Sequence, residues 1–146
     1  MKKSILFVGS MFIVVAVLLA VGCSSSSSTT SPPSGKTIAT GAAGNNLTAT
    51  ISNADGSFKK GAQEFTLTFT DASGKPIDVG SAALNLHMPA MGSMAAMNDA
   101  ATLTTTGTRG VYKGKIDVEM AGEWQAKITY EGPAGKGAFS LPVVAK

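Results

Sequence analysis

Apolar side chains recur at every second position in six short segments after Asn45, and this alternation constrains the fold more than any other feature. In one segment, for example, Phe65, Leu67 and Phe69 alternate with three threonines. A period of two is typical of β-strands that bury one face against a core. Outside the first 22 residues no window has the helical period of 3.6 residues. The segments are residues 47–51, 65–70, 84–87, 112–120, 124–130 and 139–143.

Turn-forming residues separate these segments, so each segment predicts one strand. Asn, Asp, Gly and Pro gather at residues 53–56, 71–74, 107–110 and 132–135. The threonine-rich stretch 101–106 predicts one weaker strand. Pro142 predicts an edge or a bulge, because proline cannot donate a ladder hydrogen bond. Short strands at regular spacing predict an all-β fold, an immunoglobulin-like antiparallel β-sandwich of about seven strands. A small β-barrel is the alternative.

The N-terminus has the pattern of an export signal, in which Lys2 and Lys3 precede an apolar stretch over residues 5–19. The stretch ends in Ala20-Val21-Gly22-Cys23, which resembles a bacterial lipobox, although that motif usually has Leu where Ala20 stands. The resemblance implies cleavage before Cys23 and lipidation of this residue; an uncleaved membrane helix is the alternative. Both interpretations place the domain in the cell envelope, outside the cytoplasmic membrane. In a Gram-negative cell, Ser24 would favour the periplasmic face of the outer membrane.

The composition divides the chain into three regions. Residues 1–22 are the predicted lipoprotein signal peptide, 23–44 the lipidated cysteine and a Ser/Thr/Pro/Gly-rich tether, and 45–146 a single domain. The tether has too few apolar side chains to offset the entropy cost of folding. Because Cys23 is the only cysteine, the domain cannot contain a disulfide and must be stabilised by its hydrophobic core.

The composition also argues against several classes of function. The net charge of +3 includes Lys2 and Lys3 of the signal, and no basic stripe remains, so nucleic acid is not an expected partner. One histidine and no free thiol leave too few groups for a catalytic triad, a zinc site or a blue-copper centre. We therefore do not expect an enzyme.

One loop concentrates soft metal ligands, because four of the seven methionines and the only histidine lie between residues 87 and 97. Thioether sulfur with imidazole suits Cu(I) better than it suits a hard cation. We expect Cu(I) as the cofactor and no other. The alternative is that the methionines form an apolar packing or docking surface. The expected ligands are His87, Met91, Met94 and Met97, with Met88 in reserve because its phase predicts a core position.

Three short motifs resemble the YtkA-like domain family, which is related to FixH-type proteins and to segments of heavy-metal efflux adaptors. They are Met88-Pro89-Ala90-Met91, then Gly110-Val111-Tyr112, then Met120-Ala121-Gly122-Glu123-Trp124. The resemblance covers residues 45–146. It implies an immunoglobulin-like sandwich in an exported or membrane-anchored protein, often near copper or heavy-metal handling; the lipobox adds that this protein is a bacterial lipoprotein.

Together these observations predict a membrane-anchored extracytoplasmic lipoprotein that binds or hands over Cu(I) or Ag(I) through its methionine-rich loop. Its expected partners are the membrane, through the lipid, and an envelope metal-efflux or oxidase-assembly protein. The alternative is a non-metal structural or docking module of an envelope complex, in which the same loop is an apolar contact surface.

Overall fold

The computed structural model describes residues 35–146, and within that range the chain forms nine β-strands and no helix. Two antiparallel sheets make a β-sandwich, which confirms the all-β prediction. The predicted signal peptide 1–22, Cys23 and the first part of the tether lie outside the described residues. The strands are β1 (Lys36–Gly44), β2 (Leu47–Asn53), β3 (Gly61–Thr70), β4 (Ser81–Met88), β5 (Met97–Ala100), β6 (Thr102–Thr105), β7 (Val111–Val118), β8 (Gly122–Gly132) and β9 (Gly135–Ala145).

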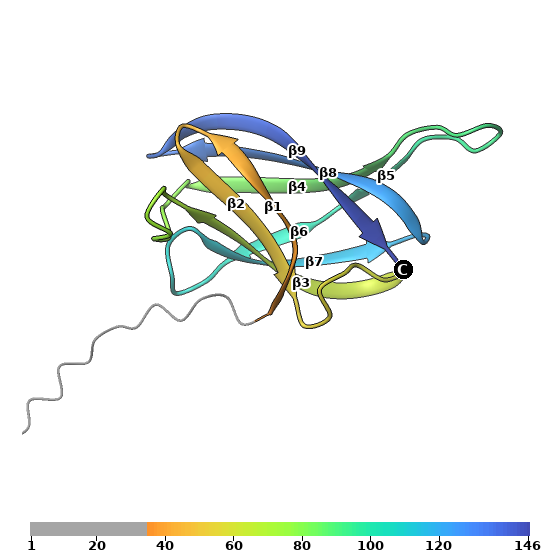
Figure 1. The fold of residues 1–146 in the computed structure, drawn as a ribbon, viewed down its shortest axis with the longest axis horizontal. Helices are drawn as coiled ribbons and strands as arrows, with labels where there is room; N and C mark the ends of the chain where they lie inside the picture. The colour runs from red at the N-terminus through yellow and green to blue at the C-terminus, as the bar shows by residue number, and fades with distance from the viewer. Residues whose placement is uncertain (1–34) are drawn as a thin grey trace, which may run out of the picture.

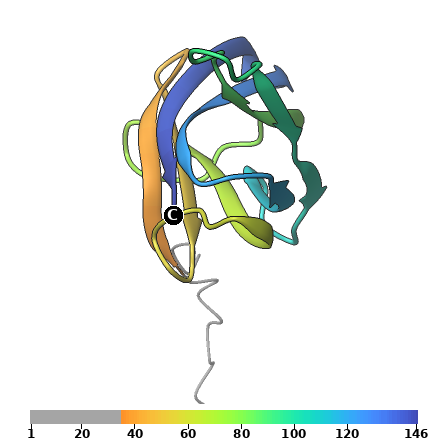
Figure 2. The ribbon, with the colours of Figure 1, turned by 90° about the vertical axis from the view of Figure 1, so that its right-hand side faces the viewer.

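The first sheet has the strand order β1-β2-β3-β7-β6 and the second the order β5-β4-β8-β9 (Figure 1). The two layers face each other across the core, with β1 beside β9 at one side (Figure 2). At the other side the chain passes directly from β5 into β6, and so from one sheet into the other. β9 is an edge strand, as Pro142 predicted. Within residues 35–146 there is also no helix that could cross a membrane.

The alternating apolar residues form a single core between the sheets. Phe65, Leu67 and Phe69 of β3 all point inward and are at most 3% exposed. Trp124 of β8 and Tyr112 of β7 are also buried in this core. Aromatic rings pack edge to face within this core, where they add directional contacts to the apolar burial.

Two of the nine strands were not expected from the sequence. Residues 36–44 form β1, although we expected residues 23–44 to be a tether. Gly41 explains how a strand so poor in apolar side chains can pack, because a Cβ at this position would collide with the side chain of Leu141 on β9. The second is β5, which begins at the last methionine of the loop, Met97.

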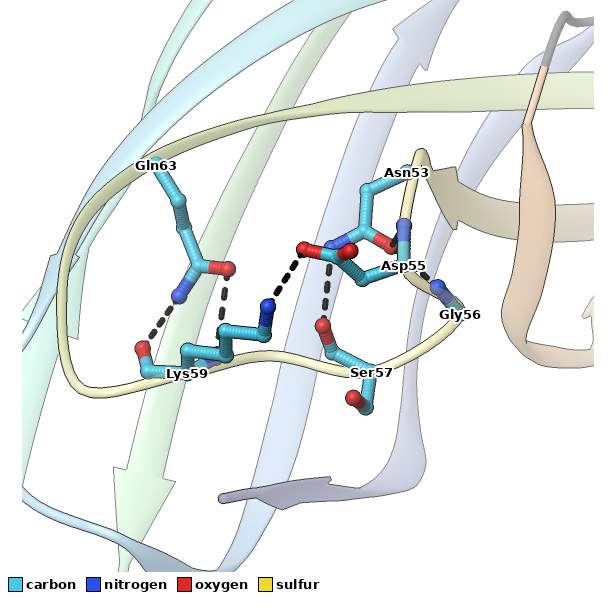
Figure 3. Close-up of polar contacts among 6 residues, drawn as sticks. All are labelled: Asn53, Asp55, Gly56, Ser57, Lys59 and Gln63. Carbon is cyan, nitrogen blue, oxygen red and sulfur yellow. Dashed lines mark hydrogen bonds and ion pairs between the residues drawn. The ribbon is translucent and has the colours of Figure 1, made fainter.

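The loop between β2 and β3 is held by side chain to backbone hydrogen bonds (Figure 3). The Asn53 Oδ1 atom accepts hydrogen bonds from the backbone N–H groups of Asp55 and Gly56, and Lys59 forms an ion pair with Asp55. This arrangement places Phe58 in the core with no exposed surface. The Phe58 carbonyl accepts a hydrogen bond of 2.8 Å from the N–H of Lys146, so the loop also fixes the end of β9.

Candidate metal centre

The methionine-rich segment is a β-hairpin that projects from one end of the sandwich (Figure 1). Strands β4 and β5 pair at its base, from Asn85 opposite Ala100 to Met88 opposite Met97. Residues 89–96 then extend beyond the paired strands. All eight are exposed, and none of them is charged.

A second pair of methionines closes the tip. The N–H of Met91 donates to the carbonyl of Met94 at 3.1 Å, and the N–H of Met94 donates to the carbonyl of Met91 at 2.9 Å. Gly92, the first residue of the two-residue turn, has a φ of 59°. A positive φ at this position is what a type II′ hairpin turn requires, and only glycine adopts it at no steric cost. The tip is therefore a defined tight turn.

The register of the tip brings two thioethers together. Residues that exchange both backbone hydrogen bonds lie directly opposite each other, with Cα atoms about 5.5 Å apart and side chains on the same face. Met91 is 52% exposed and Met94 is 42% exposed. Both side chains are therefore exposed on the same face of the tip, the arrangement that binding of one ion by two thioethers requires.

The other methionine pair belongs to the base of the hairpin. Met88 is 2% exposed and is part of the core, as its phase predicted. Met97, opposite it, is partly buried and packs against the core. Met97 follows Met94 by three residues, which is about 10 Å of extended chain. The structure therefore separates the methionine candidates into an exposed tip pair and a base pair that contacts the core.

His87 lies on the outer face of the second sheet, between Asn98 and Gln125 on the neighbouring strands. Its Nδ1 donates a hydrogen bond of 2.8 Å to Asn98 Oδ1, since an amide oxygen can only accept. A neutral imidazole that donates from Nδ1 has its lone pair on Nε2, the form in which histidine binds metals. His87 precedes Met91 by four residues, or about 13 Å of extended chain, so the structure does not bring it to the tip pair.

Harder donor sets are not found in the described part of the chain. Between residues 35 and 146 no group of three or more His, Cys, Asp or Glu side chains could hold a metal ion. The donors that the hairpin tip offers are instead the thioethers of Met91 and Met94, which are soft ligands.

A cavity of about 460 Å³ adjoins the hairpin, and the sequence did not predict it. Met91 forms part of its wall, together with Val144, a β9 residue that is 50% exposed. Two residues of β9 could have indicated this cavity from the sequence. Pro142 and Val144 are apolar, although they occupy outward-facing positions at which the alternation of the strand predicts polar residues. The other lining residues come from segments far apart in the sequence: Ile38, Gly56, Ser57, Pro89, Glu123, Trp124, Gln125, Val143 and Lys146.

Two side chains outside the hairpin have shifted pKa values: Asp71, which directly follows β3, and Tyr112 on β7. The Ser73 hydroxyl and the backbone N–H of Lys75 donate hydrogen bonds to Asp71 and lower the pKa of its carboxyl. Burial, and to a smaller extent the negative charge of Asp78, raises the pKa of Tyr112.

Comparison with known proteins identifies the family. The model of the YtkA-like family matches residues 41–129, which is more than half of the chain and includes the methionine hairpin. No curated protein and no solved structure matches the sequence. The family resemblance carried by the three short motifs is thus confirmed. The chain belongs to the YtkA-like family.

Proposed function

We propose that this protein binds Cu(I) or Ag(I) at its hairpin tip and hands the ion to a partner in the cell envelope. The observation that carries the proposal is the cross-strand pairing of Met91 with Met94, which sets two exposed thioethers on one face of the tip. Soft monovalent ions accept low coordination numbers and prefer sulfur. Thioethers are neutral and need no deprotonation, so binding does not release protons as it does from thiols.

His87 is the third donor in this proposal. No cross-strand pairing of residues 89–90 with 95–96 holds the described hairpin between its base and its tip. Bending in this segment would carry the tip toward the free Nε2 atom of His87. Met97 and Met88 contribute packing at the base rather than ligands, because withdrawing them from the core would expose apolar surface.

The site is built for exchange more than for storage. Two thioethers on an exposed turn leave one side of a bound ion open, and the cavity beside Met91 gives a partner access to that side. Because the tip is uncharged, it does not repel a partner protein that delivers or accepts the ion, whether the surface of that partner is positively or negatively charged. These features support a role as a binding protein rather than an enzyme.

The proposed cellular setting follows from the sequence before residue 35. We assign Cys23 as the lipid attachment site and place the domain outside the cytoplasmic membrane, tethered to its surface. A metal-efflux or oxidase-assembly protein of the envelope is the expected partner for transfer, and nucleic acid is not.

A Cu(I) titration of the purified protein under reductant, in competition with a chromophoric chelator, tests the proposal. We expect about one tightly bound Cu(I) per chain. Leucine keeps the apolar area of methionine but has no sulfur, so the double variant Met91→Leu/Met94→Leu should lose Cu(I) binding. Outer-shell changes at metal sites cost about 10–100-fold in affinity, so loss of both ligands should cost more.

Met120→Leu is the matched control, because Met120 is the one methionine of the described residues outside the hairpin. Its affinity should equal that of the unmodified protein. Equal affinity of the double leucine variant and the control would refute the metal site.

The second candidate function is docking without metal, and the cavity beside Met91 favours it. Two of the three large apolar side chains that are exposed in the described chain, Met91 and Val144, line this cavity. A docking surface should tolerate Met91→Leu and fail with Met91→Asp, which places a charge against an apolar partner. A metal site should fail with the leucine variant already, so the two substitutions separate the functions.

A further inference from the structure

We infer that Met91 and Met94 form an oxidation-sensitive switch: a hydroperoxide converts either thioether to its sulfoxide and thereby stops soft-metal binding at the tip. The switch rests on the proposed function, whereas the site of modification rests on the structure alone. In the reaction the sulfur lone pair attacks one peroxide oxygen. An S–O bond forms, the O–O bond breaks, sulfur is oxidised by two electrons, and the other oxygen leaves as water or an alcohol.

Exposure separates the tip methionines from the others. The described chain contains five methionines, and only Met91 and Met94 are exposed large hydrophobic residues. Met97 and Met120 are partly buried against the core. Because oxidation of methionine follows access to sulfur, the exposed fractions of 52% for Met91 and 2% for Met88 predict that Met91 is oxidised faster than Met88.

The hairpin geometry keeps the modification local. The tip is stabilised by two backbone hydrogen bonds and by the turn at Gly92, neither of which involves a sulfur atom. A polar sulfoxide on Met91 or Met94 is solvated where it stands. The same group on Met88 would be buried in the core without a partner and would destabilise the fold.

A sulfoxide also changes the ligand chemistry. Its oxygen is a harder donor than thioether sulfur and matches Cu(I) poorly. The tip supplies only two thioethers, so the loss of one leaves too few soft donors at the turn. When a fraction f of each methionine is oxidised independently, the protein that keeps both ligands falls as (1 − f)². A site that needed only one of them would lose capacity more slowly.

The test combines a map of the modification with metal binding on the same samples. The purified full-length protein is treated with hydrogen peroxide for increasing times, and peptide mass spectrometry measures the sulfoxide at each methionine. Cu(I) capacity is then titrated in each sample, and circular dichroism checks the fold. We expect Met91 and Met94 to oxidise first, Cu(I) capacity to fall with the product of their unmodified fractions, and methionine sulfoxide reductase to restore it.

Different results overturn different parts of the reasoning. Oxidation of Met88 or Met97 as fast as the tip pair would overturn the assignment of the site. Undiminished Cu(I) capacity with both tip methionines oxidised would overturn the switch and also the assignment of Met91 and Met94 as the ligands, although the protein would still bind Cu(I) elsewhere. No Cu(I) binding before treatment would refute the proposed function and the switch together, while the mass map would still decide the site of modification.

Discussion

The substitution Met88→Ala separates the structural methionines from the proposed ligands. Met88 is 2% exposed, lies opposite Met97 at the base of the hairpin, and contacts the core through its whole side chain. Truncation of a buried methionine to alanine removes its transfer free energy and leaves a cavity that the surroundings fill only in part. Such changes cost about 2–5 kcal/mol, and we expect about 3 kcal/mol here.

Thermal and urea unfolding measure this loss directly. For a domain of this size each kcal/mol lowers Tm by about 4–8 °C, so a cost of about 3 kcal/mol in Met88→Ala should lower Tm by about 12–24 °C. With a urea m-value of about 1–3 kcal/mol/M, the midpoint should fall by at least about 1 M. The control is Met91→Ala, which changes a side chain that is 52% exposed and should alter stability by less than about 0.5 kcal/mol.

Metal binding should respond in the opposite order. Folded Met88→Ala should bind Cu(I) with unchanged affinity, whereas Met91→Ala should lose it. If Met88→Ala lowers the free energy of unfolding by less than about 1 kcal/mol, Met88 is not in the core, because replacement of a buried methionine by alanine lowers it by more. Equal costs for the two alanine variants would refute the division of the hairpin into a base pair and a tip pair.

Two pH dependences follow from the shifted pKa values. The raised pKa of Tyr112 means that the unfolded chain loses this proton first, so stability should hold below about pH 10 and fall as pH rises further; Tyr112→Phe should flatten that fall in urea unfolding at pH 9–11. The lowered pKa of Asp71 contributes stability above its unfolded value of 3.8, and this contribution is lost as pH falls through the folded pKa. The stability difference between the unmodified protein and Asp71→Asn should therefore shrink in acid, and a constant difference would contradict this assignment.

The sequence predicts the sandwich because most strands bury one face against one core. The alternation of Phe65, Leu67 and Phe69 gives both the strand and its inward face. Strand β5 could not be predicted in this way. Its inward-facing residues are Met97 and Asp99, and an aspartate at an inward position interrupts the alternation of apolar and polar residues. Asp99 is 7% exposed and accepts a hydrogen bond of 3.2 Å from the N–H of Glu119, a contact that no local pattern indicates.

The candidate site shows a similar limit. Spacing identifies the methionines, but they follow one another at equal intervals of three residues, so spacing alone does not say which of them face each other. A shift of one residue in a hairpin register moves every side chain to the other face. The register is set by Gly92, the residue of the tip that adopts a positive φ, and by the inward packing of Met88. Both depend on the folded structure.

The interrupted ladder of the hairpin has a consequence for its local stability. In the described chain, cross-strand hydrogen bonds join the base and join the tip, but the segment between them, which contains Ala90, Ala95 and Ala96, is unpaired. Amide hydrogen exchange normally becomes faster toward the end of a hairpin. In this hairpin the order of exchange rates should be inverted: the amides of Met91 and Met94 should exchange more slowly than those of the unpaired segment between base and tip, which we call the neck. The tip can therefore turn as a unit about its neck without losing its own shape.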